Sequence, residues 1–212
     1  MLLISCFLFG YLVGSIPIGL IVGHVTAGLD IRRVGTGNIG ASNTWRNVGL
    51  VPAAVVGVGS FVQGFLPAWL SGLIFGQQAA MAAAGVGAVA GYGWSFMLRF
   101  RGGSAVGTAT GALAAIAPLG LVPLLALYAL GAILRQPAPG VLLGLISFVG
   151  YMKFTSEPLV LLLGSSVIVF AVIMKRFDGF QDDLHSDHAA AAFFERLLFD
   201  RRPGRGLVGP IE

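Results

Sequence analysis

Seven apolar stretches, separated by short breaks that carry glycine, proline or charge, dominate this sequence. Of its 212 residues, 56% are hydrophobic and only 10% are charged, whereas about a quarter of the residues in a soluble domain are charged. In a bilayer the backbone of such a stretch must satisfy its own hydrogen bonds, which a helix does. The sequence therefore predicts an all-α integral membrane protein. The stretches cover residues 2–23, 50–74, 79–98, 104–118, 119–134, 138–152 and 158–174.

The number of spans depends on length and charge. Residues 104–118 and 119–134 are each shorter than the about 20 residues that a membrane-spanning helix needs, so 104–134 could form one long helix. With two separate spans and the N-terminus outside, twelve of the 13 lysines and arginines lie on the cytoplasmic side and only Lys153 lies outside. This distribution follows the positive-inside tendency. We therefore expect about seven transmembrane helices, with the N-terminus outside and the C-terminus cytoplasmic.

Glycines recur at near-helical spacing in two of the stretches, and in lipid such small residues let helices approach closely. They are Gly10, Gly14, Gly19 and Gly23 in the first stretch and Gly85, Gly87 and Gly91 in the third. We expect both sets to be packing seams. The first stretch has no basic segment before it and no small-residue cleavage site after it, so we expect a retained helix and not a signal peptide.

Residues 30–49, named here the first loop, are a polar exception in the N-terminal half. Their sequence, DIRRVGTGNIGASNTWRNVG, holds three arginines, three asparagines and four glycines. Accessible backbone N–H groups and guanidinium groups suit a bound phosphate. An ordinary basic loop that orients helices would explain the arginines but not Asn38, Asn43 or the glycine spacing. Residues 35–40 match G-x-G-x-x-G, but no strand is predicted before them, as nucleotide binding would require.

A second loop, residues 99–108, carries Arg99, Arg101, Gly102 and Gly103 and then enters an apolar stretch. The glycines and the start of the following helix could present N–H groups to an anion. A tight turn between two helices is an equally good interpretation. The basic residues of the chain lie next to apolar segments, so they indicate membrane orientation and not a nucleic-acid partner.

The remaining segment, 177–212, has the composition of a polar cytoplasmic tail attached to a bundle formed by residues 1–176. Within it, residues 189–199 would place two phenylalanines and two leucines on one face, which predicts an amphipathic helix on the membrane surface. The sequence His-Ser-Asp-His at 185–188 could bind a metal, but a solvated tail is the favoured interpretation. The single cysteine, Cys6, allows neither a disulfide nor a cysteine-based metal site. We expect no metal.

Two segments together resemble the membrane glycerol-3-phosphate acyltransferases that use acyl phosphate as donor, the PlsY family. Residues 14–19, G-S-I-P-I-G, and residues 30–49 follow the family pattern nearly residue for residue, with Thr36 in place of the usual serine. The resemblance implies a multi-pass protein of the bacterial inner membrane, with no cofactor and with membrane lipid as a partner. It also implies transfer of a fatty acyl group from acyl phosphate to the 1-hydroxyl of glycerol 3-phosphate. The product, lysophosphatidate, enters phospholipid synthesis.

The resemblance implies a set of site residues as well. It assigns catalysis to Thr36, Asn38 and Arg46. It assigns substrate binding to Arg32, Gly37, Gly40 and Asn43 in the first loop and to Arg101, Gly102, Gly103, Ser104 and Thr108 in the second. Such arginines would hold phosphate oxygens and offset charge while the carbonyl is attacked, and the positioning of two bound reactants would supply much of the acceleration.

Several positions depart from the family pattern. The second loop has Ser104 where the family has a lysine, and Tyr92 stands where a histidine is usual. An aspartate and a lysine of the second span fall at Ser60 and Gln63. The place of the C-terminal His-Arg-Glu-Asn motif holds K-R-F-D-G, residues 175–179. Each lost charge-assisted hydrogen bond is worth roughly 1.5–3 kcal/mol.

These departures leave a second hypothesis open, a non-catalytic homologue that binds acyl phosphate or phospholipid or that partners an active paralogue. Within the first hypothesis, Arg101 could replace the charge of the missing lysine, and His185 or His188 could supply a base. A transporter or channel is the weakest hypothesis, because no span carries the intramembrane charge that marks an ion pathway.

Overall fold

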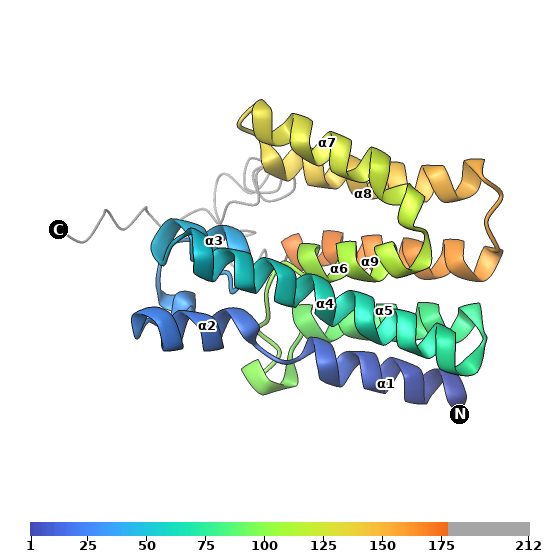
Figure 1. Cartoon of the computed structure of the whole chain (residues 1–212), viewed down its shortest axis with the longest axis horizontal. Coiled ribbons are helices and arrows are strands. Elements are labelled where there is room, and N and C mark those ends of the chain that lie inside the picture. Colours follow the sequence, from blue (N-terminus) through green and yellow to red (C-terminus); the bar gives the residue numbers. More distant parts are fainter. Residues whose placement is uncertain (178–212) are drawn as a thin grey trace, which may run out of the picture.

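The computed structural model describes residues 1–177, and every regular element in that range is helical (Figure 1). The described α-helices are α1 Leu2–Gly14, α2 Ile18–Ala27, α3 Ala41–Asn47, α4 Leu50–Phe75, α5 Gln78–Gly93, α6 Val106–Ile116, α7 Leu121–Ile133, α8 Pro137–Phe154 and α9 Leu159–Arg176. Three short 3₁₀ helices lie between them: η1 Ile31–Arg33, η2 Phe96–Leu98 and η3 Pro118–Gly120. The expected amphipathic helix at 189–199 and the histidine cluster at 185–188 lie outside the described residues.

The first apolar stretch is broken at residues 15–17 into α1 and α2. Proline has no N–H to donate, and Pro17 directly precedes α2. Gln63 of α4 reinforces the break, because its Nε2 donates to the carbonyl oxygens of Val13 and Ile16 at 2.8 Å each. Gln63 occupies the position at which the resemblance implied a lysine. Its side chain is neutral, and its N–H groups donate to backbone carbonyl oxygens of the first span.

The structure separates residues 104–118 and 119–134 into two helices, α6 and α7, joined by η3 at Pro118. This confirms the interpretation as two helices. Five segments in the described part are long and apolar enough to cross a membrane: 2–27, 50–75, 78–98, 137–154 and 159–176. Helices α6 and α7 have only 11 and 13 residues, fewer than a complete span needs. The count of seven crossings therefore stays a prediction.

Glycines of the first and third apolar stretches lie in a packing seam, as expected, and the structure shows that these two stretches pack against each other. Helix α5 lies at the centre of the bundle and contacts α1, α4, α6 and α9. A Cβ atom on Gly10, Gly14, Gly87 or Gly91 would overlap a backbone carbonyl of the facing helix, α5 or α1. Gly19 of α2 makes the same kind of approach to the carbonyl of Ile39, and this contact brings the first loop against the bundle.

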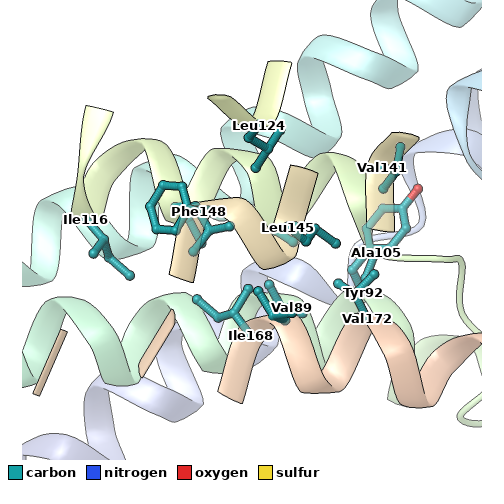
Figure 2. Packing of buried hydrophobic residues seen from close by; sticks show 14 of the residues in the cluster. Val89, Tyr92, Ala105, Ile116, Leu124, Val141, Leu145, Phe148, Ile168 and Val172 are labelled. Carbon is teal, nitrogen blue, oxygen red and sulfur yellow. The ribbon is translucent and has the colours of Figure 1, made fainter. Parts of the chain in front are cut away.

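Helices α7 and α8 form a hairpin that lies over α6 and α9 (Figure 1). Leu124 of α7 and Leu145 and Phe148 of α8 belong to the same buried cluster as Val89 of α5 and Ile168 of α9 (Figure 2). The hairpin therefore closes the bundle from one side.

Most of the charge in the described part gathers at one end of the bundle, named here the loop end. The first loop, the second loop, the turn between α7 and α8 and the end of α9 lie there, whereas the N-terminus and the turns that follow α4, α6 and α8 lie at the opposite end (Figure 1). Every lysine and arginine of residues 1–177 except Lys153 belongs to the loop end.

Candidate functional site

Asn43 of α3 organises the first loop. Its side chain is 2% exposed. Its Nδ2 lies 2.9 to 3.1 Å from three backbone carbonyl oxygens, those of Ile31, Val34 and Asn38. Its Oδ1 accepts hydrogen bonds from the Thr36 N–H and from Asn47 Nδ2, each at 3.0 Å. The amide of Asn43 therefore holds η1 and the segment after it against α3, which leaves it little capacity to bind a substrate directly.

The backbone conformation of the first loop explains its glycines. Gly35 and Gly37 adopt φ values of 56° and 71°, a region that side chains with a Cβ disfavour. In addition, a Cβ on Gly35 would overlap Asn43 Oδ1. The glycine spacing thus permits the chain to wrap closely around the Asn43 amide, a requirement that a loop serving only to orient helices would not have.

Asn38 joins the first loop to the second. Its Oδ1 accepts hydrogen bonds from the N–H of Gly40 at 3.1 Å and from the N–H of Ser104 at 3.3 Å. Its own N–H donates to Thr36 Oγ1 at 3.4 Å. Two loops that are 66 residues apart in sequence are therefore held side by side, and residues predicted for catalysis and for substrate binding meet at this point.

The second loop is anchored to the end of α5. The N–H groups of Gly102 and Gly103 donate to the carbonyl oxygens of Gly93 and Tyr92, each at 3.1 Å. A Cβ on Gly102 would lie 2.6 Å from the Gly93 carbonyl oxygen, and one on Gly103 would lie 2.9 Å from Asn38 Oδ1. Both glycines are thus needed for the close approach of three segments. Their N–H groups are occupied by α5 and are not offered to an anion.

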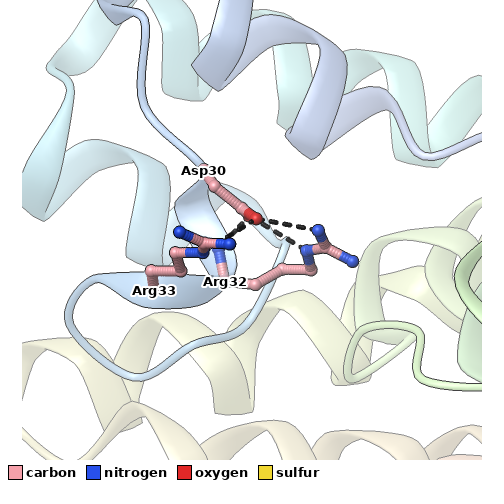
Figure 3. A network of polar contacts seen from close by, with 3 residues as sticks. All are labelled: Asp30, Arg32 and Arg33. Atoms are coloured by element: carbon pink, nitrogen blue, oxygen red, sulfur yellow. Dashed lines mark hydrogen bonds and ion pairs between the residues drawn. The ribbon is translucent and has the colours of Figure 1, made fainter.

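Arg32 turns toward Asp30 (Figure 3). Its Nε and Nη2 donate to the two carboxylate oxygens at 2.9 and 2.7 Å, and Arg33 Nε lies 3.6 Å from the same carboxylate. The hydrogen bonds from Arg32 lower the pKa of Asp30 to about 2, and the same pairing raises the pKa of Arg32. These residues line an open groove of about 720 Å³ beside α2, together with His24. Arg32 therefore lines this groove and is not among the residues that line the cavity at the junction of the two loops.

A second cavity, of about 260 Å³, begins at the junction of the two loops. Gly40 and Ser104 line it at the loops, and Ser60, Phe61 and Gly107 line it from α4 and α6. The α7–α8 hairpin closes it with Leu124, Leu125, Tyr128, Val141 and Leu145. One part of the cavity is thus mainly polar, and the other is mainly apolar, with Tyr128 as its one polar side chain. This is the arrangement that a molecule with a charged head and an apolar chain requires.

The other predicted site residues are distributed around this junction. Gly37 is half-buried in the loop, while Thr36, Arg46 and Arg101 are exposed at the loop end. Thr108 is fully buried, and its Oγ1 has no hydrogen-bond partner in the described part of the chain. Its carbonyl packs against Gly64 of α4. The structure thus brings Asn38, Gly40 and Ser104 together and places Thr108 in the helix contact behind them.

Three residues near the loop end were not predicted as site residues. Tyr92 is buried and lines the cavity. Lys175 is 6% exposed, with its stem beside Gly93 and its Nζ 5.2 Å from the centre of the Trp94 ring. Arg176 donates to the Ala138 carbonyl at 3.0 Å and so ties α9 to α8. The sequence did offer a signal for these residues. The resemblance expects a histidine at the position of Tyr92 and a polar motif at the positions that begin with Lys175 and Arg176.

The sequence is similar to that of known proteins. Residues 4–181 match a family model described as "Glycerol-3-phosphate acyltransferase". A protein of that name from Desulforamulus reducens is 30% identical over 168 residues, which are 79% of this chain and 81% of the relative. Another from Bacillus velezensis is 33% identical over 178 residues, 83% of this chain and 91% of the relative.

Solved structures show the same fold. The chain superposes with a TM-score of 0.77 on the crystal structure of PlsY, an integral membrane glycerol 3-phosphate acyltransferase, in its glycerol 3-phosphate form, at 27% identity. The match covers 86% of this chain and 92% of that one. The lysophosphatidic acid form of PlsY gives a TM-score of 0.75 at 26% identity. A multi-pass, all-helical membrane fold follows from these matches and from the apolar helices.

Proposed function

Because the chain belongs to the glycerol-3-phosphate acyltransferase family, we propose that it transfers a fatty acyl group from acyl phosphate to the 1-hydroxyl of glycerol 3-phosphate. The observation that carries this proposal is the cavity that runs from the junction of the two loops to the hydrocarbon wall of α7 and α8. An acyl phosphate has one charged and one apolar part, and the two parts of the cavity match them. The relatives are named as acyltransferases, so the non-catalytic alternative is not favoured.

The reaction needs few protein groups. The 1-hydroxyl oxygen of glycerol 3-phosphate attacks the carbonyl carbon, a new ester bond forms and the bond from that carbon to the phosphate oxygen breaks. Inorganic phosphate leaves and carries away the hydroxyl proton, so that atoms and charge balance. The protein's task is to hold two anionic reactants together and to stabilise the charge that develops on the carbonyl oxygen.

The polar groups near the cavity suit these tasks. Val106 and Gly107 line the cavity and are the first residues of α6, where N–H groups have no partner within the helix and attract anions. Ser104 offers a hydroxyl beside them. We assign to the exposed Arg46 and Arg101 the capture of phosphate oxygens from the aqueous side. Asn38 and Asn43 then hold the two loops in the conformation that binds the substrates.

We place the loop end at the cytoplasmic face of the bacterial inner membrane. Glycerol 3-phosphate is a charged molecule that reaches the site from water, and the first and second loops are the polar segments beside the cavity. The positive-inside tendency supports the same orientation, because Lys153 alone among the lysines and arginines of residues 1–177 lies at the other end. This orientation puts the N-terminus outside, with seven crossings if α6 and α7 each count as one, and sends the tail from residue 177 into the cytoplasm.

The proposal is tested with purified protein in lipid nanodiscs, supplied with palmitoyl phosphate and radiolabelled glycerol 3-phosphate. We expect labelled lysophosphatidate to form in proportion to enzyme and time, with release of one phosphate for each ester made. Palmitoyl coenzyme A in place of palmitoyl phosphate is the control for donor class. Absence of labelled product from folded protein would reject catalysis and restore the non-catalytic alternative.

A further inference from the structure

Tyr92 is a buried residue whose hydroxyl the fold itself does not use. The residue is 3% exposed, and its hydroxyl makes no hydrogen bond with another residue of 1–177. The hydroxyl oxygen is not one of the fully buried polar atoms that lack a partner, so it is accessible from the cavity that Tyr92 lines. By contrast, the hydroxyl of Tyr11 donates to the carbonyl oxygen of Trp94 at 2.7 Å. A tyrosine hydroxyl is both a donor and an acceptor of hydrogen bonds. Because the Tyr92 hydroxyl has no protein partner and opens onto the cavity, it is available to a molecule bound there.

The position of the Tyr92 ring is fixed from several sides. Its backbone carbonyl accepts the N–H of Gly103. Its Cε1 is so near Gly103 that a Cβ there would lie only 2.6 Å away. Figure 2 shows the hydroxyl directed away from α9 and toward Val141 of α8, a residue of the cavity wall. The hydroxyl thus projects from the centre of the bundle into the cavity.

Tyr92 also lies where the polar and the apolar parts of the cavity meet. Gly40 and Ser104, at the junction of the loops, and Leu145, on the hydrocarbon side, line the same cavity. In an acyl phosphate, the carbonyl group is the link between the phosphate and the hydrocarbon chain. A hydrogen-bond donor at the boundary between the two environments would therefore face this carbonyl, which is one bridging oxygen away from the phosphorus atom.

We propose that the Tyr92 hydroxyl donates a hydrogen bond to the carbonyl oxygen of the acyl phosphate and stabilises the negative charge on that oxygen during attack. This inference rests on the function proposed above. As the glycerol hydroxyl adds to the carbonyl carbon, the electron pair of the C=O bond moves to oxygen. It returns when the bond to phosphate breaks. Tyr92 keeps its proton throughout, so it is a hydrogen-bond donor and not a general acid.

The test is Tyr92→Phe, which removes only the hydroxyl and keeps the ring against Gly103. We expect kcat to fall about 100-fold, as on loss of one oxyanion donor, while the KM for glycerol 3-phosphate changes less than twofold. The melting temperature should stay equal or rise, because the fold loses no hydrogen bond. Tyr151→Phe is the matched control. It removes a hydroxyl from α8 at the opposite end of the bundle and should leave kcat unchanged.

The outcomes separate this inference from the proposed function. An active wild-type protein and an equally active Tyr92→Phe variant would overturn the role of Tyr92 and leave the acyltransferase assignment intact. A loss of activity that parallels a lower melting temperature would show a structural role and would equally overturn it. A wild-type protein without transfer activity would reject both.

Discussion

Replacement of Asn43 by alanine is the sharpest test of how the first loop is held. The Asn43 amide has two N–H groups and two oxygen lone pairs, and all face protein groups at 2.9 to 3.1 Å. At about 0.5–1 kcal/mol net for each of four hydrogen bonds, the loop should lose about 2–4 kcal/mol of local stability. At 1.4 kcal/mol for each factor of ten, the open state gains roughly 30- to 700-fold in population.

Hydrogen–deuterium exchange measures this opening directly. The Thr36 N–H, which donates to Asn43 Oδ1, should exchange roughly 30- to 700-fold faster in Asn43→Ala, and transfer activity should fall with it. Asn47→Ala is the matched control on the same helix. Its amide serves the Asn43 carbonyl and Oδ1 only, so its removal should accelerate exchange less than about tenfold. Equal exchange in the wild type and in Asn43→Ala would refute the role of Asn43 as organiser of the loop.

Three further predictions follow from the loop end. Arg46→Ala should weaken binding of glycerol 3-phosphate at least tenfold without lowering the melting temperature, as isothermal titration and thermal scanning can show; unchanged affinity would mean that this arginine only orients helices. Gly102→Ala should abolish transfer, because its methyl group would overlap the Tyr92 carbonyl and displace the second loop; an active Gly102→Ala protein would contradict the geometry described for that loop. The Asp30–Arg32 pair should stabilise the fold above the ordinary carboxyl pKa of 3.8 and lose this effect as the pH falls toward 2, since the folded-state pKa is the lower one. The melting temperatures of wild type and Asp30→Asn should therefore differ at pH 6 and converge near pH 2, and a constant difference would argue against the pair.

Much of the fold was predictable because membrane helices leave a strong signal. The apolar stretches gave the helices, and the charge distribution correctly favoured two helices in 104–134. Gly10, Gly14, Gly87 and Gly91 were correctly predicted as packing positions, but the sequence did not show that α1 and α5 pack against each other. The first apolar stretch was predicted as one helix, whereas the structure breaks it at residues 15–17. The stabilisation of this break by Gln63 depends on a contact between residues about 50 positions apart.

The site was predictable in part, for physical reasons that individual residues show. The motif predicted that Asn38, Gly40 and Ser104 belong to one site, and the structure joins them. The motif did not show that the Asn43 side chain and the N–H groups of Gly102 and Gly103 form hydrogen bonds within the protein. Nor did it show that Arg32 pairs with Asp30. Partners within the fold compete with a ligand for every polar group, and a sequence motif does not reveal which partner is bound. The unused hydroxyl of Tyr92 became visible only from its surroundings.

The central claim is that acyl transfer takes place in the cavity between the two loops and the α7–α8 hairpin. Photo-crosslinking with an acyl phosphonate that carries a diazirine in its chain tests this most directly, with mass spectrometry to locate the label. We expect label on the segments around Phe61, Leu124 and Leu145, and its loss on addition of unlabelled palmitoyl phosphate. Label confined to the groove beside α2, around Ile21 and Val25, with the same competition, would contradict the claim.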